Sequence, residues 1–149
     1  MNPTQKPDTT AAALADLTPA VILRCAARYL ELHGWIQDSY HQPNTTDPFP
    51  PACAVGAISM AIYGYRDAVP SDRTTALSAA WRLLERTIRV LDNHIDATED
   101  LPGELDGDTP YGDPVSYGWN DLPCQTRERV IAALRTAADD YDRTHGGTR

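Results

Sequence analysis

The longest apolar run in this chain, residues 52–62, constrains its fold more than any other feature. A helix that is apolar on every side is buried at the centre of a domain, because none of its faces suits water. The run falls short of the ~18 residues that a membrane span requires, and Gly64 follows it as a helix terminator. Gly56 costs the helix about 1 kcal/mol relative to Ala, which predicts that a neighbouring segment approaches closely there. The sequence therefore predicts a buried central helix over residues 51–63.

Three amphipathic segments are expected to pack around this central helix. The first covers residues 19–33, where Thr18 caps free amides and Pro19 stands at a position whose N–H has no partner. The second extends from residue 71 or 72 to about 94, and the third covers residues 127–141. Each has apolar residues at spacings of three and four, which is typical of a helix with one buried face. The predicted fold class is mainly α, with about four helices in one compact domain.

The helical domain is expected to cover residues 10–143. Residues 1–9 contain prolines and small polar residues that bury nothing, which predicts a disordered lead-in. Residues 144–149 are expected to form a frayed tail. Between the first two helices, residues 36–50 combine a short strand-like stretch with a proline-rich turn, and a small β-hairpin is predicted there.

Charge limits the classes of partner that the chain is expected to bind. The formal net charge is −8, whereas binding to nucleic acid or to an anionic membrane depends on a basic patch that releases counterions. We therefore expect no direct nucleic-acid contact and no membrane contact. Arg82, Arg86 and Arg89 share one stripe of the second amphipathic segment, and this stripe is interpreted as a solvated face.

Cysteine and histidine usage gives no sign of a disulfide or a metal site. The three cysteines, Cys25, Cys53 and Cys124, are odd in number and follow no disulfide or zinc spacing. The four histidines show no metal-ligand spacing either. This usage fits a reducing cytoplasm, and the apolar residues near the N-terminus are too few for a signal-peptide core. A cytoplasmic protein with no metal and no other cofactor is expected.

Residues 96–118 concentrate nearly all of the net negative charge. They contain seven acidic residues and no Lys, Arg or His, so they carry −7 of the net −8. Long connections of this kind tend to be functional or disordered. One interpretation is a solvated, mobile insertion, and the other is a docking surface for a basic protein partner. The residues predicted to contact such a partner are Asp100, Glu104, Asp106, Asp108, Tyr111 and Tyr117.

Cys53 lies in the first turn of the predicted central helix, where the helix N-terminus stabilises a thiolate. Cys53, His94 and then Asn120 or Asp121 also follow the chain order of cysteine-dependent enzymes. In this alternative His94 is the base and Asp121 the orienter. Such enzymes present the base and the orienter from a sheet, and little strand sequence lies between His94 and Trp119. A small buried cysteine is the simpler interpretation. The cysteine enzyme therefore stays an alternative, and an enzyme is not favoured.

Trp119, Asn120 and Asp121 form a second motif of interest. Asn and Asp side chains bond the backbone of tight turns, and Asp121 is expected to cap a turn that includes Pro123. Trp119 is expected to anchor the adjoining loop to the core. Alternatively, one aromatic ring and two polar groups make the floor of a small-molecule pocket, beside Cys53 at the start of the central helix.

Several positions resemble a family of small proteins without a known activity that occurs in actinobacteria and their phages. The matching positions lie between residues 18 and 141 and are Gly34-Trp35, Cys53, Gly56-Ala57, Trp119-Asn120-Asp121, Pro123, Thr126 and Val130. Gly, Arg and Glu are usual in that family where this chain has Cys124, Gln125 and Arg129, and loss of the Glu removes half of a capping box. The resemblance implies a cytoplasmic accessory protein, and it implies no reaction.

Taken together, the sequence favours a non-enzymatic interaction or regulatory protein that binds its partner through the acidic, aromatic-containing segment at residues 96–118. A small-molecule-binding protein, with its pocket at Cys53 and residues 119–121, is the alternative. The sequence leaves the oligomeric state open.

Overall fold

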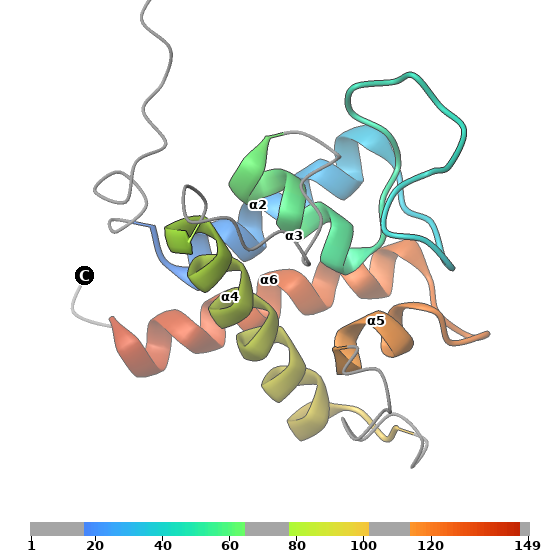
Figure 1. The fold of residues 1–149 in the computed structure, drawn as a ribbon. Helices are drawn as coiled ribbons and strands as arrows, with labels where there is room; N and C mark the ends of the chain where they lie inside the picture. The colour runs from blue at the N-terminus through green and yellow to red at the C-terminus, as the bar shows by residue number, and fades with distance from the viewer. Residues whose placement is uncertain (1–16, 65–77, 102–113, 147–149) are drawn as a thin grey trace, which may run out of the picture.

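The computed structural model describes residues 17–64, 78–101 and 114–146, and helices dominate this part of the chain. In chain order they are α2 (Pro19–His33), α3 (Ala54–Tyr63), α4 (Ser78–Thr98), α5 (Val115–Asn120) and α6 (Arg127–His145) (Figure 1). No strand occurs within the described ranges, which confirms the predicted mainly α class. None of the helices described is long and apolar enough to cross a membrane. The predicted lead-in at residues 1–9 lies outside the described residues.

Threonine side chains determine where two of the helices begin. Thr18 Oγ1 accepts a backbone N–H in the first turn of α2 at 3.3 Å, and α2 covers the predicted residues 19–33. Thr126 Oγ1 accepts a backbone N–H in the first turn of α6 at 3.2 Å. α6 continues to His145 instead of ending at Tyr141, so the first part of the expected frayed tail is helical. The rings of these two residues stack with centroids 4.0 Å apart, which stabilises the last turn.

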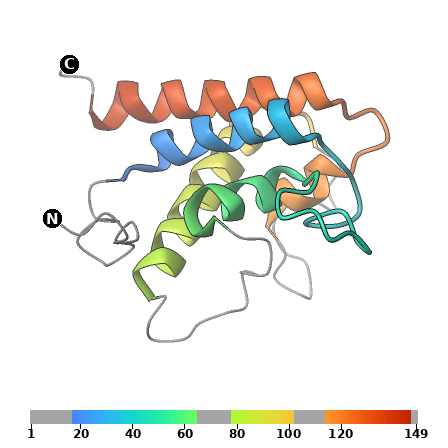
Figure 2. The same ribbon diagram turned by 90° about the horizontal axis from the view of Figure 1, so that it is seen from above.

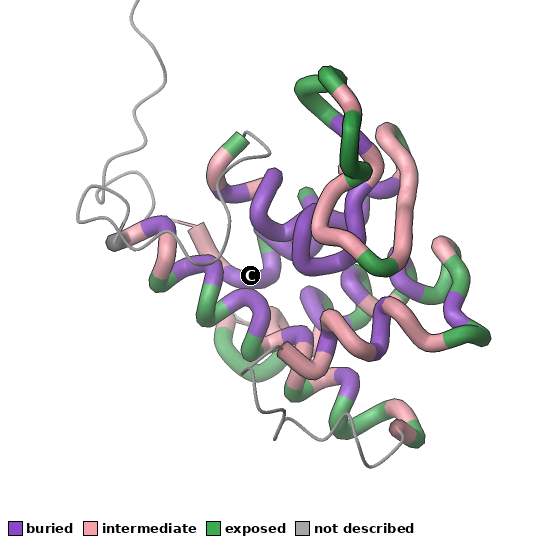
Figure 3. Tube along the Cα trace, turned by 45° about the vertical axis from the view of Figure 1, so that its right-hand side comes forward, coloured by how far each residue is buried: buried purple, intermediate pink, exposed green. Residues whose placement is uncertain are grey.

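α3 is the central helix that the sequence predicts, although it begins at Ala54 instead of residue 51. Cys53 has an extended backbone and acts as the N-cap, and its Sγ accepts a hydrogen bond from the N–H of Gly56 at 3.3 Å. Nearly all of α3 is buried (Figure 3). Gly64 ends the helix in the left-handed conformation, with φ 81°.

The loop before α3 passes directly against the helix at Gly56. A Cβ atom at this position would lie 2.0 Å from the carbonyl oxygen of Tyr40. The same carbonyl accepts a hydrogen bond from the N–H of Cys53 at 3.1 Å, which fixes the loop at this distance. The predicted close approach is therefore confirmed, and it explains a glycine that the helix alone would disfavour.

The other helices cover α3 as the amphipathic pattern predicts. α2 makes its most extensive contacts with α6, which lies beside it, and with α3 (Figures 1 and 2). α4 contacts α2, α3, α5 and α6. The largest side chains of the shared core come from all five helices and include Leu23, Leu30, Ile58, Leu84, Leu91, Trp119 and Leu134.

The β-hairpin predicted at residues 36–50 does not form. Within the described residues this region makes only isolated β-bridges, from Trp35 and from His41, and both pair with Ala52. Asp38 and Asn44 have positive φ values of 72° and 59°, which interrupt the extended backbone that a strand needs. The loop also directs the Gln37 side chain to backbone carbonyls at the end of α5, so its polar groups find partners without a second strand.

The acidic segment at residues 96–118 is not one continuous loop. Its first residues complete α4, which continues to Thr98, and its last residues belong to α5. α5 was not predicted, because it is only six residues long and includes a glycine. Residues 102–113 lie outside the described part of the chain. The predicted start of the α4 segment, at residue 71 or 72, also lies outside it.

Candidate functional site

α5 brings the Trp119-Asn120-Asp121 motif against the loop that follows α2 and against the start of α3. Trp119 is 1% exposed and Asn120 is fully buried. Trp119 Nε1 donates to Glu99 Oε1 at 3.1 Å, and its carbonyl oxygen accepts a hydrogen bond from Gln125 Nε2 at 2.9 Å. Trp119 is therefore a core residue that anchors α5, in agreement with the structural interpretation of the motif.

The Asn120 side chain uses all of its hydrogen-bonding capacity within the protein. Its Oδ1 accepts from Trp35 Nε1 at 2.7 Å and from the N–H of Ala54 at 3.0 Å. Its Nδ2 donates to the carbonyl oxygen of Ile36 at 3.0 Å and to Asp121 Oδ1 at 3.1 Å. An amide side chain has two donor N–H groups and one acceptor oxygen with two lone pairs. No donor or acceptor of the Asn120 side chain therefore remains for a ligand.

Two of the contacts at this junction cap the start of α3. The first N–H groups of a helix have no partner within the helix. Asn120 supplies an acceptor for the N–H of Ala54, and Cys53 supplies one for the N–H of Gly56. Since Asn120 also bonds the loop after α2, a single side chain joins three segments that are far apart in the sequence.

Asp121 bonds a distant loop instead of capping the turn through Pro123, which corrects the sequence prediction. Its Oδ1 accepts a hydrogen bond from the N–H of Asp38 at 2.9 Å. Gln37 Nε2 donates to the carbonyl oxygens of residues 120 and 122, at 3.1 and 2.9 Å. Asp38 is one of the residues with positive φ, so the Asp121 carboxylate stabilises a backbone conformation that few side chains favour.

Asp92 of α4 holds the other end of α5, and no sequence pattern points to it. Its Oδ1 accepts a hydrogen bond from the N–H of Ser116 at 2.8 Å. The carboxylate replaces an N-cap side chain, because Pro114 at the cap position provides none. Burial raises the pKa of Asp92 above its usual value, and hydrogen bonds from Ser116 and Val115 oppose this shift.

Cys53 lies in an environment that disfavours the thiolate. The residue is fully buried. Burial raises the pKa of its thiol to about 11, and the negative charge of Asp121 also raises it, whereas hydrogen bonds from the N–H groups of α3 lower it. The thiol is therefore protonated at neutral pH. A nucleophilic cysteine needs a lowered pKa and access to solvent.

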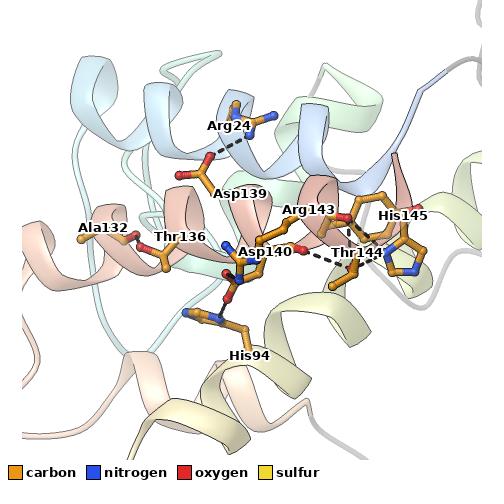
Figure 4. A network of polar contacts seen from close by, with 10 residues as sticks. Arg24, His94, Ala132, Thr136, Asp139, Asp140, Arg143, Thr144 and His145 are labelled. Carbon is orange, nitrogen blue, oxygen red and sulfur yellow. Dashed lines mark hydrogen bonds and ion pairs between the residues drawn. The ribbon is translucent and has the colours of Figure 1, made fainter. Parts of the chain in front are cut away.

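His94 is engaged between α4 and α6. Its Nδ1 lies 3.0 Å from Asp140 Oδ2, and Asp140 also accepts a hydrogen bond from Arg143 (Figure 4). Arg143 and, to a smaller extent, His94 lower the pKa of Asp140. Cys53, His94 and Asp121 thus have separate hydrogen-bond partners, and no hydrogen bond among the described residues links them into a catalytic relay.

The remaining predicted site residues are divided between described and undescribed parts of the chain. Asp100 is exposed, and Tyr117 is half-buried, with its ring centroid 4.9 Å from that of Tyr40. The other predicted contact residues, Glu104, Asp106, Asp108 and Tyr111, lie outside the described residues. In the described ranges no three His, Cys, Asp or Glu side chains gather closely enough to hold a metal ion.

The described residues therefore define a small helical protein in which the Trp-Asn-Asp motif joins α3, α5 and the loop after α2. The chain belongs to the family of unknown function DUF6197, whose model matches residues 14–140. This match agrees with the resemblance to a family without a known activity. Comparisons with curated proteins and with solved structures gave no match.

Proposed function

We propose that this protein is a non-enzymatic interaction or regulatory accessory protein that binds a basic protein partner through its acidic segment, residues 96–118. The observation that carries the proposal is that all four hydrogen bonds of the Asn120 side chain are internal. The motif that most resembles a site is therefore part of the scaffold. We therefore assign binding to a different part of the chain. The acidic segment is the most unusual remaining feature of the sequence.

Hydrogen bonds join the two elements on either side of residues 102–113, which are α4 and α5. On one side, Glu99 follows α4 and accepts a hydrogen bond from the Trp119 indole. On the other side, Asp92 of α4 accepts a hydrogen bond from the N–H of Ser116. The end of α4 and the two ends of α5 are thus held together by side-chain hydrogen bonds. This arrangement holds the described flanking residues Asp100 and Tyr117 in place, so they lose little freedom when a partner docks.

The charge of the segment supports a basic partner. The segment contains seven acidic side chains and no Lys, Arg or His. Glu99 pairs with Arg129 at 3.6 Å, and the excess negative charge attracts a positively charged surface and accelerates its association. Tyr111 and Tyr117 add aromatic side chains of the kind that often dominate binding energy. All three cysteines are free thiols, which supports a reducing cytoplasm as the compartment.

The proposal is tested by neutralising the acidic segment. The variant carries Asp100→Asn, Glu104→Gln, Asp106→Asn and Asp108→Asn, and it is compared with wild-type protein for capture of basic proteins from a cell extract. We expect the variant to lose this capture while its melting temperature stays unchanged. We also expect wild-type capture to weaken as salt is added, because the contacts are between exposed charges.

A matched control removes four negative charges elsewhere, with Glu85→Gln, Glu128→Gln, Asp139→Asn and Asp142→Asn. If the control loses the same partners, the effect is one of net charge and the segment has no special role. Native mass spectrometry of the wild-type protein, before and after denaturation, addresses the alternative. A bound mass that is lost on denaturation would favour a small-molecule-binding protein.

A further inference from the structure

The exposed side of α4 carries a straight row of polar residues with opposite charges at its two ends. The row follows spacings of four and three residues, so its members share one face of the helix. All of them are exposed, and in order they are Arg82, Arg86, Arg89, Asn93 and Asp96. Asp100 continues the spacing just beyond the end of α4 and is also exposed. Side chains at these spacings therefore form one continuous stripe along the helix.

The direction of this charge pattern is not explained by the stability of α4 alone. A helix favours acidic residues in its first turns and basic residues in its last turns, because its N-terminus is partially positive. α4 has no acidic residue in its first turn and no basic residue in its last turn. The arginines instead lie toward its N-terminus, and Asp96 lies near its C-terminus. The charges therefore gain nothing from the dipole of α4.

Ion pairs among the described residues do not account for the three arginines either. Arg24, Arg127 and Arg135 each bond an acidic side chain on the same helix or on a neighbouring one. Within the described ranges, none of the three arginines of the α4 row lies within ion-pair distance of a described carboxylate. Glu85 lies beside the row, between Arg82 and Arg89 on the helix surface, and does not pair with either.

A second copy of α4, lying antiparallel, would place two of the three arginines of the row opposite carboxylates. If the two-fold axis crosses the exposed face of α4 at the height of residue 91, Arg86 of each copy faces Asp96 of the other. The same arrangement places Arg89 opposite Asn93, and Arg82 opposite Asp100. In an isologous interface the same surface patch of each subunit contacts that of the other, so the exposed face of α4 supplies both sides of the contact. Arg–Asp pairs are also the best suited to bidentate hydrogen bonds.

We propose that this protein forms a two-fold symmetric homodimer in which the exposed faces of two α4 helices pair in antiparallel orientation. A second copy is favoured over an unrelated acidic partner, because the row contains both charges in the order that self-pairing requires. The net charge of −8 disfavours nucleic acid as the occupant. This inference rests on described residues of α4 and on Asp100, and it shares Asp96 and Asp100 with the acidic segment of the function proposed above. Arg86 lies outside that segment, so Arg86→Glu tests the dimer separately.

The test uses two single charge reversals, Arg86→Glu and Asp96→Arg, with association measured by sedimentation equilibrium. Arg86→Glu gives a protomer with two negative positions, and Asp96→Arg gives one with two positive positions. We expect each variant alone to self-associate at least about tenfold more weakly than the wild type, because like charges then face each other. Mixed together, the two variants are expected to form a one-to-one dimer, since both facing pairs are again opposite in sign.

Neither reversal should impair folding of α4, so loss of association is not a sign of unfolding. The glutamate that Arg86→Glu introduces would lie next to Arg82 and Arg89 on its own helix, and an arginine at position 96 suits the helix C-terminus. Circular dichroism spectra identical to that of the wild type confirm this point. The matched controls are Arg28→Glu and Glu128→Arg, which change net charge by the same amounts outside the row.

Several results would overturn the proposal. A wild-type protein that stays monomeric at every concentration and salt level rules out the dimer. A dimer that the two single variants retain, or a mixture of them that fails to associate, shows that the α4 row is not the interface. Equal weakening by the matched controls assigns the effect to net charge. Tight binding of an oligonucleotide by the wild type and not by Arg86→Glu would assign the row to phosphate binding instead.

Discussion

The side-chain oxygen of Asn120 accepts a hydrogen bond from the N–H of Ala54, the first residue of α3, at 3.0 Å. The same oxygen accepts the indole N–H of Trp35 at 2.7 Å. One buried amide therefore caps the central helix and holds the loop after α2 against α5. The junction and the segments that it joins can each be tested by substitution.

Replacement of Asn120 tests whether the motif is structural. Asn120→Ala leaves the buried N–H of Ala54 and the part-buried indole N–H of Trp35 without an acceptor, at a cost of roughly 1–3 kcal/mol for each unsatisfied group. We expect a loss of about 3 kcal/mol or more in the free energy of unfolding, measured in urea. Asn120→Asp keeps the acceptor, but it loses the donated bonds and places a charge beside Asp121, so it should also destabilise. Gln42→Ala, an exposed change in the same loop, is the control and should be nearly neutral.

Gly56→Ala should destabilise the protein although Ala is the better helix former. The new Cβ would lie 2.0 Å from the Tyr40 carbonyl oxygen, which is itself held by a hydrogen bond from Cys53. We expect a loss of about 1–3 kcal/mol, the usual cost of overpacking. Gly64→Ala is the comparison, since a Cβ there meets no atom within 4 Å and the cost arises only from the positive φ. A smaller loss for Gly56→Ala than for Gly64→Ala would contradict the close approach.

The thiol of Cys53 should react only when the protein unfolds. Cys25 and Cys124 are exposed and should be alkylated quickly at pH 8, whereas Cys53 is fully buried. Rapid alkylation of Cys53 in the native protein, read by peptide mass spectrometry, would reinstate the cysteine enzyme as an alternative.

The raised pKa of Cys53 also predicts a pH dependence of stability. The pKa is raised from 9.0 to about 11, so the folded protein holds the thiol proton more tightly than the unfolded chain. This stabilisation is present below about pH 9 and is lost as the pH rises toward about 11. We expect the stability difference between the wild type and Cys53→Ala to shrink over this interval. Tyr29, whose pKa is raised to about 12, is present in both proteins and cancels in the comparison.

Two substitutions of Asp92 separate its charge from its role as a hydrogen-bond acceptor. Burial raises the pKa of Asp92, which means that the ionised carboxylate is disfavoured in the folded protein. Asp92→Asn keeps an acceptor for the N–H of Ser116 and removes the buried charge, so we expect stability at pH 7 to be unchanged or higher. Asp92→Ala removes the cap and should cost about 1 kcal/mol. As the pH falls, the wild type should gain stability relative to Asp92→Asn, because its carboxylate becomes protonated.

Thermal unfolding from pH 4 to 7 checks the Asp92 prediction. If Asp92→Asn were as destabilising as Asp92→Ala at pH 7, the negative charge itself would be required at the start of α5. Desolvation would then be the smaller of the two effects.

The site was only partly predictable from the sequence. Trp119, Asn120 and Asp121 stood out as a motif, and burial of Trp119 was expected. Nothing in the spacing of residues indicated that Gln37 and Asp92 hold α5 in place, or that Trp35 would bond Asn120. These contacts join residues 24 to 85 positions apart, and short motifs carry no information about such pairs. No pattern in the sequence indicated the contact between Gln125 and the carbonyl oxygen of Trp119.

The features that the sequence by itself determined are those that depend on neighbouring residues. The boundaries of α2, the start of α6 just after Thr126 and the burial of α3 follow from caps, glycine terminators and apolar spacing, because each is decided within a few residues. The close approach at Gly56 was predicted for the same reason, since a glycine inside a helix is costly by itself. The tertiary structure decided the rest. Residues 36–50 lost their hairpin to hydrogen bonds with α5, and burial left Cys53 protonated, because these outcomes depend on segments that only folding brings together.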